Sequence, residues 1–355
     1  MPNKILASPA PEWKSLSTAP ERGLDDRKAC LKSAPPLVTS DTDHHPRNRM
    51  PSITCYGATN LDRTARCLDE LVLRSSNPVR VRQAAGGVAR NVATNLAHLG
   101  NTVALSTVVG ADAGGDELLR SLAADGIETG ETLRREDRPT ASYTAILDHD
   151  GELLIGLADM AIYDDVDRAT LGVYGCNQNS DAWFIDANLS DDCLDALFSA
   201  GSTTTIAAST VSTPKASRLA GYLDRIDILF ANRAEAAVLA DHDIQSNDDA
   251  LIAANRLHHK GVGTVFVTLG PRGATVAGSS AQSILPAIPS AARDVVGAGD
   301  AFAAGALAAL LGSASLEDAM LSGLATASLT VEVDGPTDPK LDKLRVQERM
   351  RHKVS

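Results

Sequence analysis

Two glycines and an aspartate near the C-terminal end of the chain, Gly297, Gly299 and Asp300, have the chemistry of a phosphate site. Glycine lets the backbone bend and expose its N–H groups without a Cβ in the way. The small residues that follow predict a helix over Ala303–Leu311, and a helix N-terminus attracts negative charge. We therefore expect Gly297, Ala298 and Gly299 to form an anion hole. We expect Asp300 to be the catalytic base that accepts the proton of an attacking hydroxyl, although helix N-cap is an alternative role.

A second candidate group is an asparagine and a glutamate three residues apart, Asn232 and Glu235, just after a predicted strand that ends at Phe230. Residues three apart at the start of a helix share one face, so their oxygens could hold Mg²⁺ through water molecules. We also expect Asn232 to contact ATP. The alternative is a capping box, because N-x-x-E has that spacing too.

Polar and glycine residues in the first part of the folded region are suited to binding a sugar. Asn60 and Asp62 follow the first predicted strand, where a carboxylate could chelate two vicinal hydroxyls; an Asx turn is the alternative. Gly86 and Gly87 open a predicted helix and permit both close ligand approach and a hinge. Asn91 lies one turn into that helix, on the side of the glycines. We expect all five residues to bind substrate.

A strand-to-turn segment, Thr268-Leu269-Gly270-Pro271-Arg272-Gly273, is suited to lining the phosphate tail of a nucleotide. We expect Thr268, Gly270 and Gly273 to contact ATP, although the segment by itself would be an ordinary turn. The chain contains no G-x-x-x-x-G-K-[ST] motif, which excludes the P-loop route to phosphoryl transfer.

The candidate residues follow short apolar runs that alternate with helical stretches. Runs typical of buried parallel strands occur at Ser52–Gly57, Thr102–Val109, Trp183–Asp186, Thr204–Ala208, Ile226–Phe230 and Thr264–Thr268. Helices are predicted over Val88–Leu99, Gly115–Ala124, Asp191–Ser199, Ala234–Ala240 and Asp248–His259. This alternation predicts an α/β fold with a mainly parallel central sheet and helices on both of its faces.

Two segments, about 63–84 and 138–160, break the alternation. In the second, predicted strands at Ala141–Asp148 and Glu152–Leu157 are joined by His149-Asp150-Gly151, an Asp-Gly hairpin signal. Two β insertions in a βα chain predict a small separate sheet, which could be a lid over the ligand cleft at the strand ends. A lid sheet leaves a β edge that can pair with a second copy, so we expect a homodimer through the lid.

In their order along the chain, these motifs resemble those of the ribokinase-like (PfkB) carbohydrate kinase superfamily, with its glycine-glycine switch, N-x-x-E magnesium motif and terminal G-A-G-D motif. The resemblance covers about Pro51–Gly335. It implies a three-layer αβα kinase domain over 50–340, a C-terminal tail over 341–355, and ATP and Mg²⁺ as cofactors. The resemblance implies that Asp294 contacts ATP, and in relatives its position helps to build a loop for a monovalent cation such as K⁺. The family usually has Thr or Asn where this chain has Val296, so we expect altered nucleotide affinity and retained activity.

Within the superfamily the chain is most similar to the pseudouridine kinases. The similar segments are G-G-V-A-R-N-V-A at 86–93, S-Y-T-A-I-L-D at 142–148, A-D-M at 158–160 and D-A-N-L-S at 186–190. The resemblance implies further substrate contacts from Ser142, Asp159 and Asn188, and ATP-dependent phosphorylation of the 5′-hydroxyl of pseudouridine. The alternatives are another sugar or nucleoside, such as ribose, a fructose-type sugar, adenosine or uridine, and a non-catalytic sugar or nucleoside sensor on a kinase scaffold.

Composition narrows the classes of partner. The 355-residue chain has a formal net charge of -12, which opposes attraction to nucleic acid or to an anionic membrane. No stretch approaches the roughly 18 apolar residues of a membrane span. Residues 1–49 are rich in proline and have no apolar period, so we expect a disordered N-terminal extension. Met50 follows that segment, and a start codon assigned too early is the alternative. Without a secretory or transit signature, we expect a cytoplasmic enzyme whose partners are a small ribosyl substrate and ATP.

Overall fold

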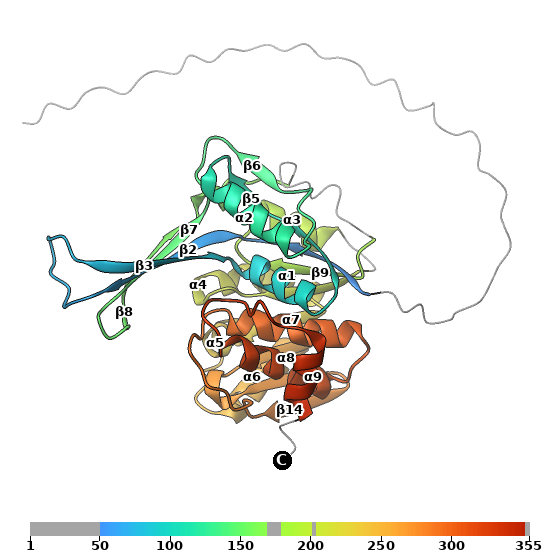
Figure 1. Cartoon of the computed structure of the whole chain (residues 1–355). Coiled ribbons are helices and arrows are strands. Elements are labelled where there is room, and N and C mark those ends of the chain that lie inside the picture. Colours follow the sequence, from blue (N-terminus) through green and yellow to red (C-terminus); the bar gives the residue numbers. More distant parts are fainter. Residues whose placement is uncertain (1–49, 169–178, 201–203, 352–355) are drawn as a thin grey trace, which may run out of the picture. The chain divides into compact units, whose positions relative to one another are not determined.

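The computed structural model describes residues 50–168, 179–200 and 204–351 (Figure 1). The predictions made for residues 1–49 and for the last four residues of the expected tail lie outside these ranges. Within the described ranges, no helix combines the length and the apolar character needed to cross a membrane.

An eight-stranded sheet forms the centre of the described region, in the order β14-β13-β12-β11-β10-β9-β1-β4. From β4 to β12 neighbouring strands are parallel, whereas β13 and β14 are antiparallel additions at one edge. Because the six parallel strands all end at the same edge, the loops that follow them meet there. The strands are β1 (Ser52–Tyr56), β4 (Thr102–Ser106), β9 (Ala182–Asp186), β10 (Thr205–Ser209), β11 (Ile228–Asn232), β12 (Thr264–Thr268), β13 (Ala274–Gly278) and β14 (Ala281–Leu285).

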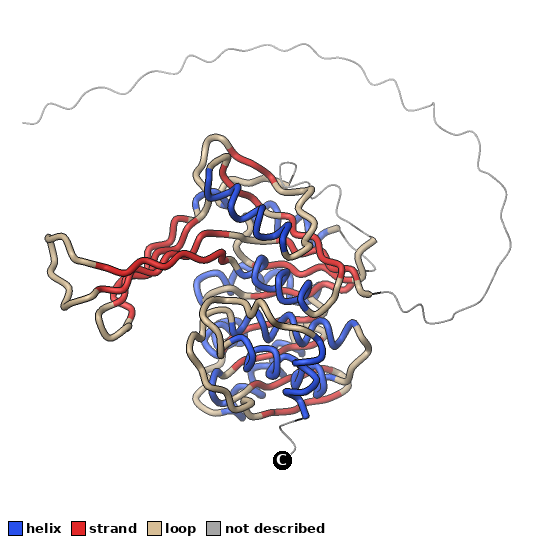
Figure 2. The backbone as a smooth tube through the Cα atoms, viewed as in Figure 1, coloured by secondary structure: helices blue, strands red, loops and turns tan. Residues whose placement is uncertain are grey.

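Helices cover both faces of this sheet, as the sequence predicts (Figure 2). Successive strand residues point to opposite faces, so on β9 Trp183 and Ile185 join one hydrophobic core while Ala182 and Phe184 join the other. The first core is closed by α3 (Asp191–Ser199), α4 (Thr213–Ala216), α5 (Arg233–Ala240) and α6 (Asn247–His259). The second is closed by α1 (Val88–His98), α7 (Ala298–Leu311), α8 (Leu316–Thr330) and α9 (Lys343–Arg351). The architecture is therefore the expected three-layer α/β fold.

A second, four-stranded sheet extends away from the large one, in the order β3-β2-β7-β8 (Figure 1). Its strands are β2 (Asn60–Cys67), β3 (Val79–Gly86), β7 (Ser142–Leu147) and β8 (Leu153–Asp159). The β7–β8 turn is fixed by Asp148, whose Oδ1 accepts hydrogen bonds from the backbone N–H groups of Asp150, Gly151 and Glu152. This sheet, called the lid sheet below, confirms the prediction of a small sheet from the two β insertions.

Some predicted boundaries need correction. The single strand expected over Thr102–Val109 is interrupted at Thr107, and the chain continues as β5 (Val108–Gly110), which pairs with β6 (Leu133–Arg135) next to α2 (Ala113–Ala124). The antiparallel strands β13 and β14 and the helix α8 were not predicted. Their Ala, Gly and Ser residues give little apolar periodicity, and packing against the rest of the fold decides their structure.

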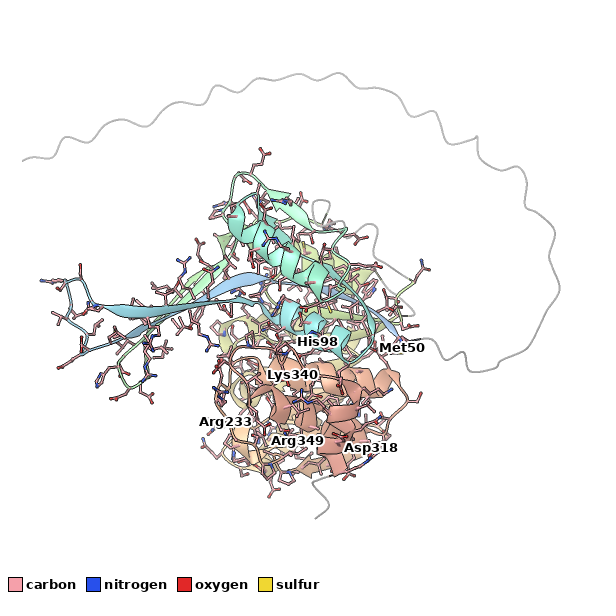
Figure 3. All side chains as sticks on the ribbon, in the orientation of Figure 1. Met50, His98, Arg233, Asp318, Lys340 and Arg349 are labelled. Carbon is pink, nitrogen blue, oxygen red and sulfur yellow. The ribbon has the colours of Figure 1, made fainter. Side chains whose placement is uncertain are left out.

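The expected C-terminal tail is also different in the structure, because it contains α9. Val346 on this helix is buried, and Arg345 pairs with the buried carboxylate of Asp338 at 2.7 Å. Arg349, labelled in Figure 3, pairs with Glu332 after α8 at 2.8 Å. Two buried apolar side chains, Leu341 and Val346, and two ion pairs thus attach the expected tail to the body.

Candidate active site

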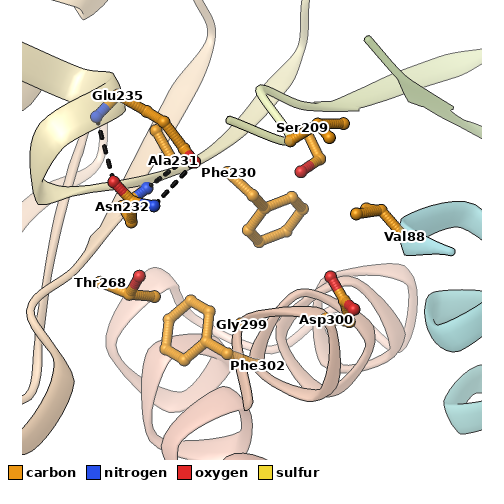
Figure 4. A pocket seen from close by; sticks show the side chains of 11 residues that line it. Val88, Ser209, Phe230, Ala231, Asn232, Glu235, Thr268, Gly299, Asp300 and Phe302 are labelled. Atoms are coloured by element: carbon orange, nitrogen blue, oxygen red, sulfur yellow. Dashed lines mark hydrogen bonds between the residues drawn. The ribbon is translucent and has the colours of Figure 1, made fainter. Parts of the chain in front are cut away.

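The ends of the parallel strands enclose a pocket of about 120 Å³ (Figure 4). It collects residues from the ends of three strands and the starts of three helices: Ser209, Asn232, Thr268, Val88, Glu235, Gly299 and Asp300. Asn232, Glu235, Thr268, Gly299 and Asp300 were predicted from separate motifs, and the structure brings them to one cavity.

Asp300 lies in the first turn of α7 and is partly buried. Its Oδ2 accepts a hydrogen bond of 2.8 Å from the side-chain amide of Asn91 on α1. Burial raises the pKa of Asp300 to about 7; the Asn91 bond opposes this shift, and the negative charges of Asp186, Asp62 and Glu235 add to it. A carboxylate that titrates near neutral pH is matched to accepting a proton from a hydroxyl. The alternative role of N-cap is wrong, since Gly297 occupies that position.

The turn before Asp300 has the geometry of an anion site. Gly297 has φ 76°, and a Cβ there would lie 2.2 Å from the carbonyl oxygen of Pro336, so no other residue fits. Gly299 faces open space. The first N–H groups of a helix have no partner within it; that of Ala298 bonds to the carbonyl oxygen of Val295 at 3.3 Å, and those of Gly299 and Asp300 remain for an anion. Asp294 holds the turn by accepting 3.0 Å bonds from the N–H groups of Val296 and Gly335.

The predicted sugar-binding residues lie where the lid sheet joins the body. Asn60 donates its side-chain amide to Asp62 Oδ1 at 2.6 Å. Asp62 lies directly against Gly86, where a Cβ would be 2.1 Å from the carboxylate. At Gly87, with φ 102°, a Cβ would be 2.3 Å from the carbonyl oxygen of Ala58. The two glycines therefore allow lid strand β3 to lie against Asp62 and to turn into α1.

A buried carboxylate that the sequence analysis did not select, Asp186, organises this region. It is fully buried at the end of β9 and accepts hydrogen bonds of 2.9, 3.0 and 2.9 Å from the backbone N–H groups of Ala58, Ala89 and Asn188. Lys215 on α4 donates to the side-chain oxygen of Asn188, and burial lowers the pKa of this lysine. The D-x-N segment thus connects β1, α1 and α4 around the cleft.

Asn232 and Glu235 form the capping box that was the alternative interpretation of their spacing. The Glu235 carboxylate accepts hydrogen bonds from the Asn232 N–H at 2.9 Å, the Asn232 amide at 2.7 Å and the Thr210 hydroxyl at 2.5 Å. An ionised carboxylate has about four acceptor positions, so one remains toward the pocket. In the described ranges no three His, Cys, Asp or Glu residues cluster as metal ligands. Because most of their polar atoms are already bonded to the protein, the two side chains fit Mg²⁺ that is held through its water molecules.

The expected nucleotide turn lies at the end of β12. Thr268 lines the pocket, and Gly270–Arg272 form a short 3₁₀ turn (η4). Gly273 has φ 101°, and a Cβ there would be 2.0 Å from the carbonyl oxygen of Leu285 on β14. Gly270 has φ 59° and no neighbour within 4 Å of a would-be Cβ. Gly273 thus serves packing, whereas Gly270 is exposed in the turn that follows Thr268.

The structure separates two predicted substrate contacts, Ser142 and Asp159, from Asp62. They are paired with each other and with Leu61 in the lid sheet, so they share the face opposite to that of Asp62. The β7 residue paired with Asp62 is Tyr143, a half-exposed aromatic side chain that the sequence analysis did not select. Strand alternation, once the register is known, is the signal that identifies it.

Comparison with known proteins agrees with this geometry. The profile of the family described as pfkB family carbohydrate kinase matches residues 50–344. The chain belongs to this family. Pseudouridine kinase of Escherichia coli is 29% identical over 255 residues, which cover 71% of this chain and 82% of that enzyme.

Solved structures give the same result. A carbohydrate kinase from Agrobacterium tumefaciens has a TM-score of 0.75 and 33% identity, covering 85% of this chain and 97% of that one. Arabidopsis thaliana ribokinase, solved with ribose and ATP, has a TM-score of 0.72 at 22% identity over 85% and 99% of the two chains. The fold is therefore ribokinase-like, and the protein is a phosphotransferase with an alcohol group as acceptor.

Proposed function

We propose that this kinase uses ATP to phosphorylate the 5′-hydroxyl of pseudouridine in the cytoplasm. The observation that carries the proposal is Asp300, which lies in the first turn of α7 with a pKa raised to about 7 and shares a pocket with Asn232 and Glu235. The 29% identity to a pseudouridine kinase supports the choice of substrate, and the ATP bound in the Arabidopsis ribokinase structure supports the choice of phosphoryl donor.

In the proposed mechanism, Asn60 and Asp62 bind the ribosyl hydroxyls next to Gly86. Asp300 accepts the proton of the 5′-hydroxyl as that oxygen attacks the γ-phosphorus in line. The N–H groups of the turn at 297–299 stabilise the negative charge on the transferring group. Mg²⁺, held through water by Asn232 and Glu235, would supply further positive charge. Closure of the lid sheet would exclude water and limit ATP hydrolysis.

Two side chains favour a nucleoside over a free sugar. Tyr143 offers an aromatic ring on the face of the lid sheet that also carries Asp62, and such a ring can stack on a nucleobase. Lys215 donates one hydrogen bond, to the side-chain oxygen of Asn188. Its remaining N–H groups could be donated to a base carbonyl.

The test is ATP-dependent phosphorylation of pseudouridine, uridine, adenosine, ribose and fructose, with Mg²⁺ and with or without K⁺. We expect kcat/KM for pseudouridine to exceed the others more than about tenfold, or about 1.4 kcal/mol of transition-state discrimination. Preference for another substrate would overturn the choice of pseudouridine and leave the kinase chemistry. Binding of these compounds without turnover would favour a sensor.

The Asp300→Asn variant tests the base. It should lose turnover, with kcat reduced on the order of 10³-fold, while substrate binding measured by calorimetry is retained. Near-wild-type turnover of this variant would refute the role of Asp300.

We further propose a homodimer through the lid sheet. The side chains of Val79, Val81, Ile155 and Leu157 are 40 to 56% exposed, and the pairing register gives them one face, opposite to that of Asp62. A row of exposed apolar side chains on a sheet is a typical protein contact surface. A second copy of the same sheet would bury it on both chains at once.

A further inference from the structure

Arg90, the residue before Asn91 on α1, is buried although it carries a full charge, and only 5% of it is exposed. Its Nη1 donates to the carbonyl oxygen of Ala85 and to Asn91 Oδ1, both at 3.2 Å. Its Nη2 lies 3.5 Å from the Ser121 hydroxyl on α2. Among the described residues its Nε has no hydrogen-bond partner. A buried arginine that leaves one donor unmet costs stability, so a role in the site is a better explanation than a role in folding.

The contacts of Asn91 indicate that role. An asparagine amide has a donating end and an accepting end, and it can turn by 180° to exchange them. In this structure the accepting oxygen faces the guanidinium of Arg90, and the donating nitrogen faces the Asp300 carboxylate at 2.8 Å. Guanidinium is only a donor and an ionised carboxylate is only an acceptor. This is the one orientation that satisfies both neighbours.

We propose that Arg90 is a positioning residue that locks the Asn91 amide with its N–H toward Asp300 and so holds the base in its proton-accepting state. While Arg90 donates to Asn91 Oδ1, that oxygen cannot accept a hydrogen bond from a protonated Asp300. The ionised form of Asp300 is thereby favoured over the protonated form. This role rests on the proposed function of Asp300 as the base.

Arg90 also connects the base to the lid sheet. Ala85 is the residue of β3 immediately before Gly86, the glycine that lies against Asp62. The Arg90 guanidinium therefore contacts both β3, the strand that packs against the proposed substrate-binding carboxylate of Asp62, and Asn91, the residue that orients the base. Movement of β3 with the lid sheet would act on the Arg90–Asn91 contact, so the base is oriented when the strand is in place.

None of the charged groups around Asp300 and Arg90 that are named below is a cation that could take the place of Arg90 beside Asn91. The groups acting on Asp300 are Asp186 at the end of β9, Asp62 on β2 and Glu235 on α5, and all of them are negative. The negative groups near Arg90 are Asp62 and Asp125, the latter 3.9 Å from Nη2. Asp125 is held in addition by His98 and Thr94, so it keeps partners when Arg90 is replaced.

The test is the pH dependence of kcat/KM in Arg90→Met, with the best of the five substrates named above. Without Arg90, the Asn91 amide can turn and accept a hydrogen bond from protonated Asp300, which stabilises the neutral acid. We expect the acid limb of the pH profile to move up by about 0.5 to 1 pH unit, and kcat/KM at pH 7 to fall about two- to fivefold. Arg90→Lys, which keeps a cationic donor, should bring the limb back toward the wild-type pH. Arg120→Met, an exposed arginine on α2, is the matched control and should change neither value.

A second pair of variants separates positioning from folding. In the Asn91→Ala background, Arg90→Met should give no further shift of the limb if Arg90 acts through Asn91. If Arg90→Met lowers kcat/KM equally at every pH and leaves the acid limb of the profile at the wild-type pH, the inference is overturned. If Arg90→Met fails to fold, Arg90→Gln is measured by the same criterion, because its amide no longer dictates the orientation of Asn91. An active Asp300→Asn variant would refute the role of Asp300 as the base. If Asp300→Asn is inactive and the acid limb of Arg90→Met is at the wild-type pH, only the role of Arg90 is refuted.

Discussion

Replacement of the proposed base by asparagine should make the folded protein more stable while it removes activity. In the folded state burial raises the pKa of Asp300 from 3.8 to about 7. A carboxyl group whose folded-state pKa is raised disfavours folding once it ionises. The wild-type protein is therefore unaffected at pH values below 3.8, loses stability progressively between pH 3.8 and about pH 7, and is constant above that. The Asp300→Asn variant has no such dependence at this position.

The size of the effect follows from the same shift. At about 1.4 kcal/mol per pKa unit, the free energy of unfolding loses at most about 4 kcal/mol at pH 8 and about 2 kcal/mol at pH 5. Asp300 is only partly buried, so solvent reduces both values, and we expect a difference of about 1 to 2 kcal/mol between the two pH values. The new amide can still accept the hydrogen bond from Asn91, so no other contact is lost.

The assay is urea denaturation of the wild-type protein and Asp300→Asn at pH 5 and pH 8. The stability advantage of the variant should be larger at pH 8, and its m-value should equal that of the wild type, which shows that the same surface is exposed on unfolding. A stability advantage that does not depend on pH, or a variant less stable than the wild type at pH 8, would refute the claim that the ionised carboxylate of Asp300 destabilises the folded protein.

Three further variants test other parts of the structure. Gly86→Ala puts a methyl group 2.1 Å from the Asp62 carboxylate, so KM for the ribosyl substrate should rise on the order of tenfold or more with kcat less affected; an unchanged KM would argue against sugar binding by Asp62. Ile155→Lys places a charge on the apolar lid face and should convert a dimer to monomers in light scattering, whereas a monomeric wild type would disprove the interface. Removal of residues 1–49 should leave kcat/KM unchanged within about twofold, because none of the proposed chemistry uses that segment.

Local chemistry explains which parts of the site could be predicted from sequence. The Gly297–Asp300 turn and the Asn232–Glu235 capping box each lie within four residues, so spacing alone limits their geometry. The hairpin at Asp148–Gly151 was likewise predicted, because the turn is made by bonds between neighbouring residues. In each of these cases the interacting residues are at most about four positions apart in the sequence.

The contacts that assemble the site have no such local signal. Asn91 and Asp300 are 209 residues apart, and Asp186 binds N–H groups 128 and 97 residues away. Each of these side chains could equally have been a surface or turn residue. Tyr143 was missed for a related reason: its side of the lid sheet depends on register with β2, which only the pairing of two distant strands determines.

Hydrogen bonding also explains why Asp300, and not one of the other carboxylates near the cleft, is suited to be the base. Asp186 and Glu235 each accept three hydrogen bonds from the protein, and both are buried. Asp62 is paired with Asn60 and lies against Gly86. Asp300 lines the pocket and accepts one bond, from Asn91, so its other acceptor positions can take a substrate proton. The three neighbouring negative charges that add to the burial effect on its pKa are fixed by their own partners, so the site favours proton binding at the carboxylate that lines the pocket.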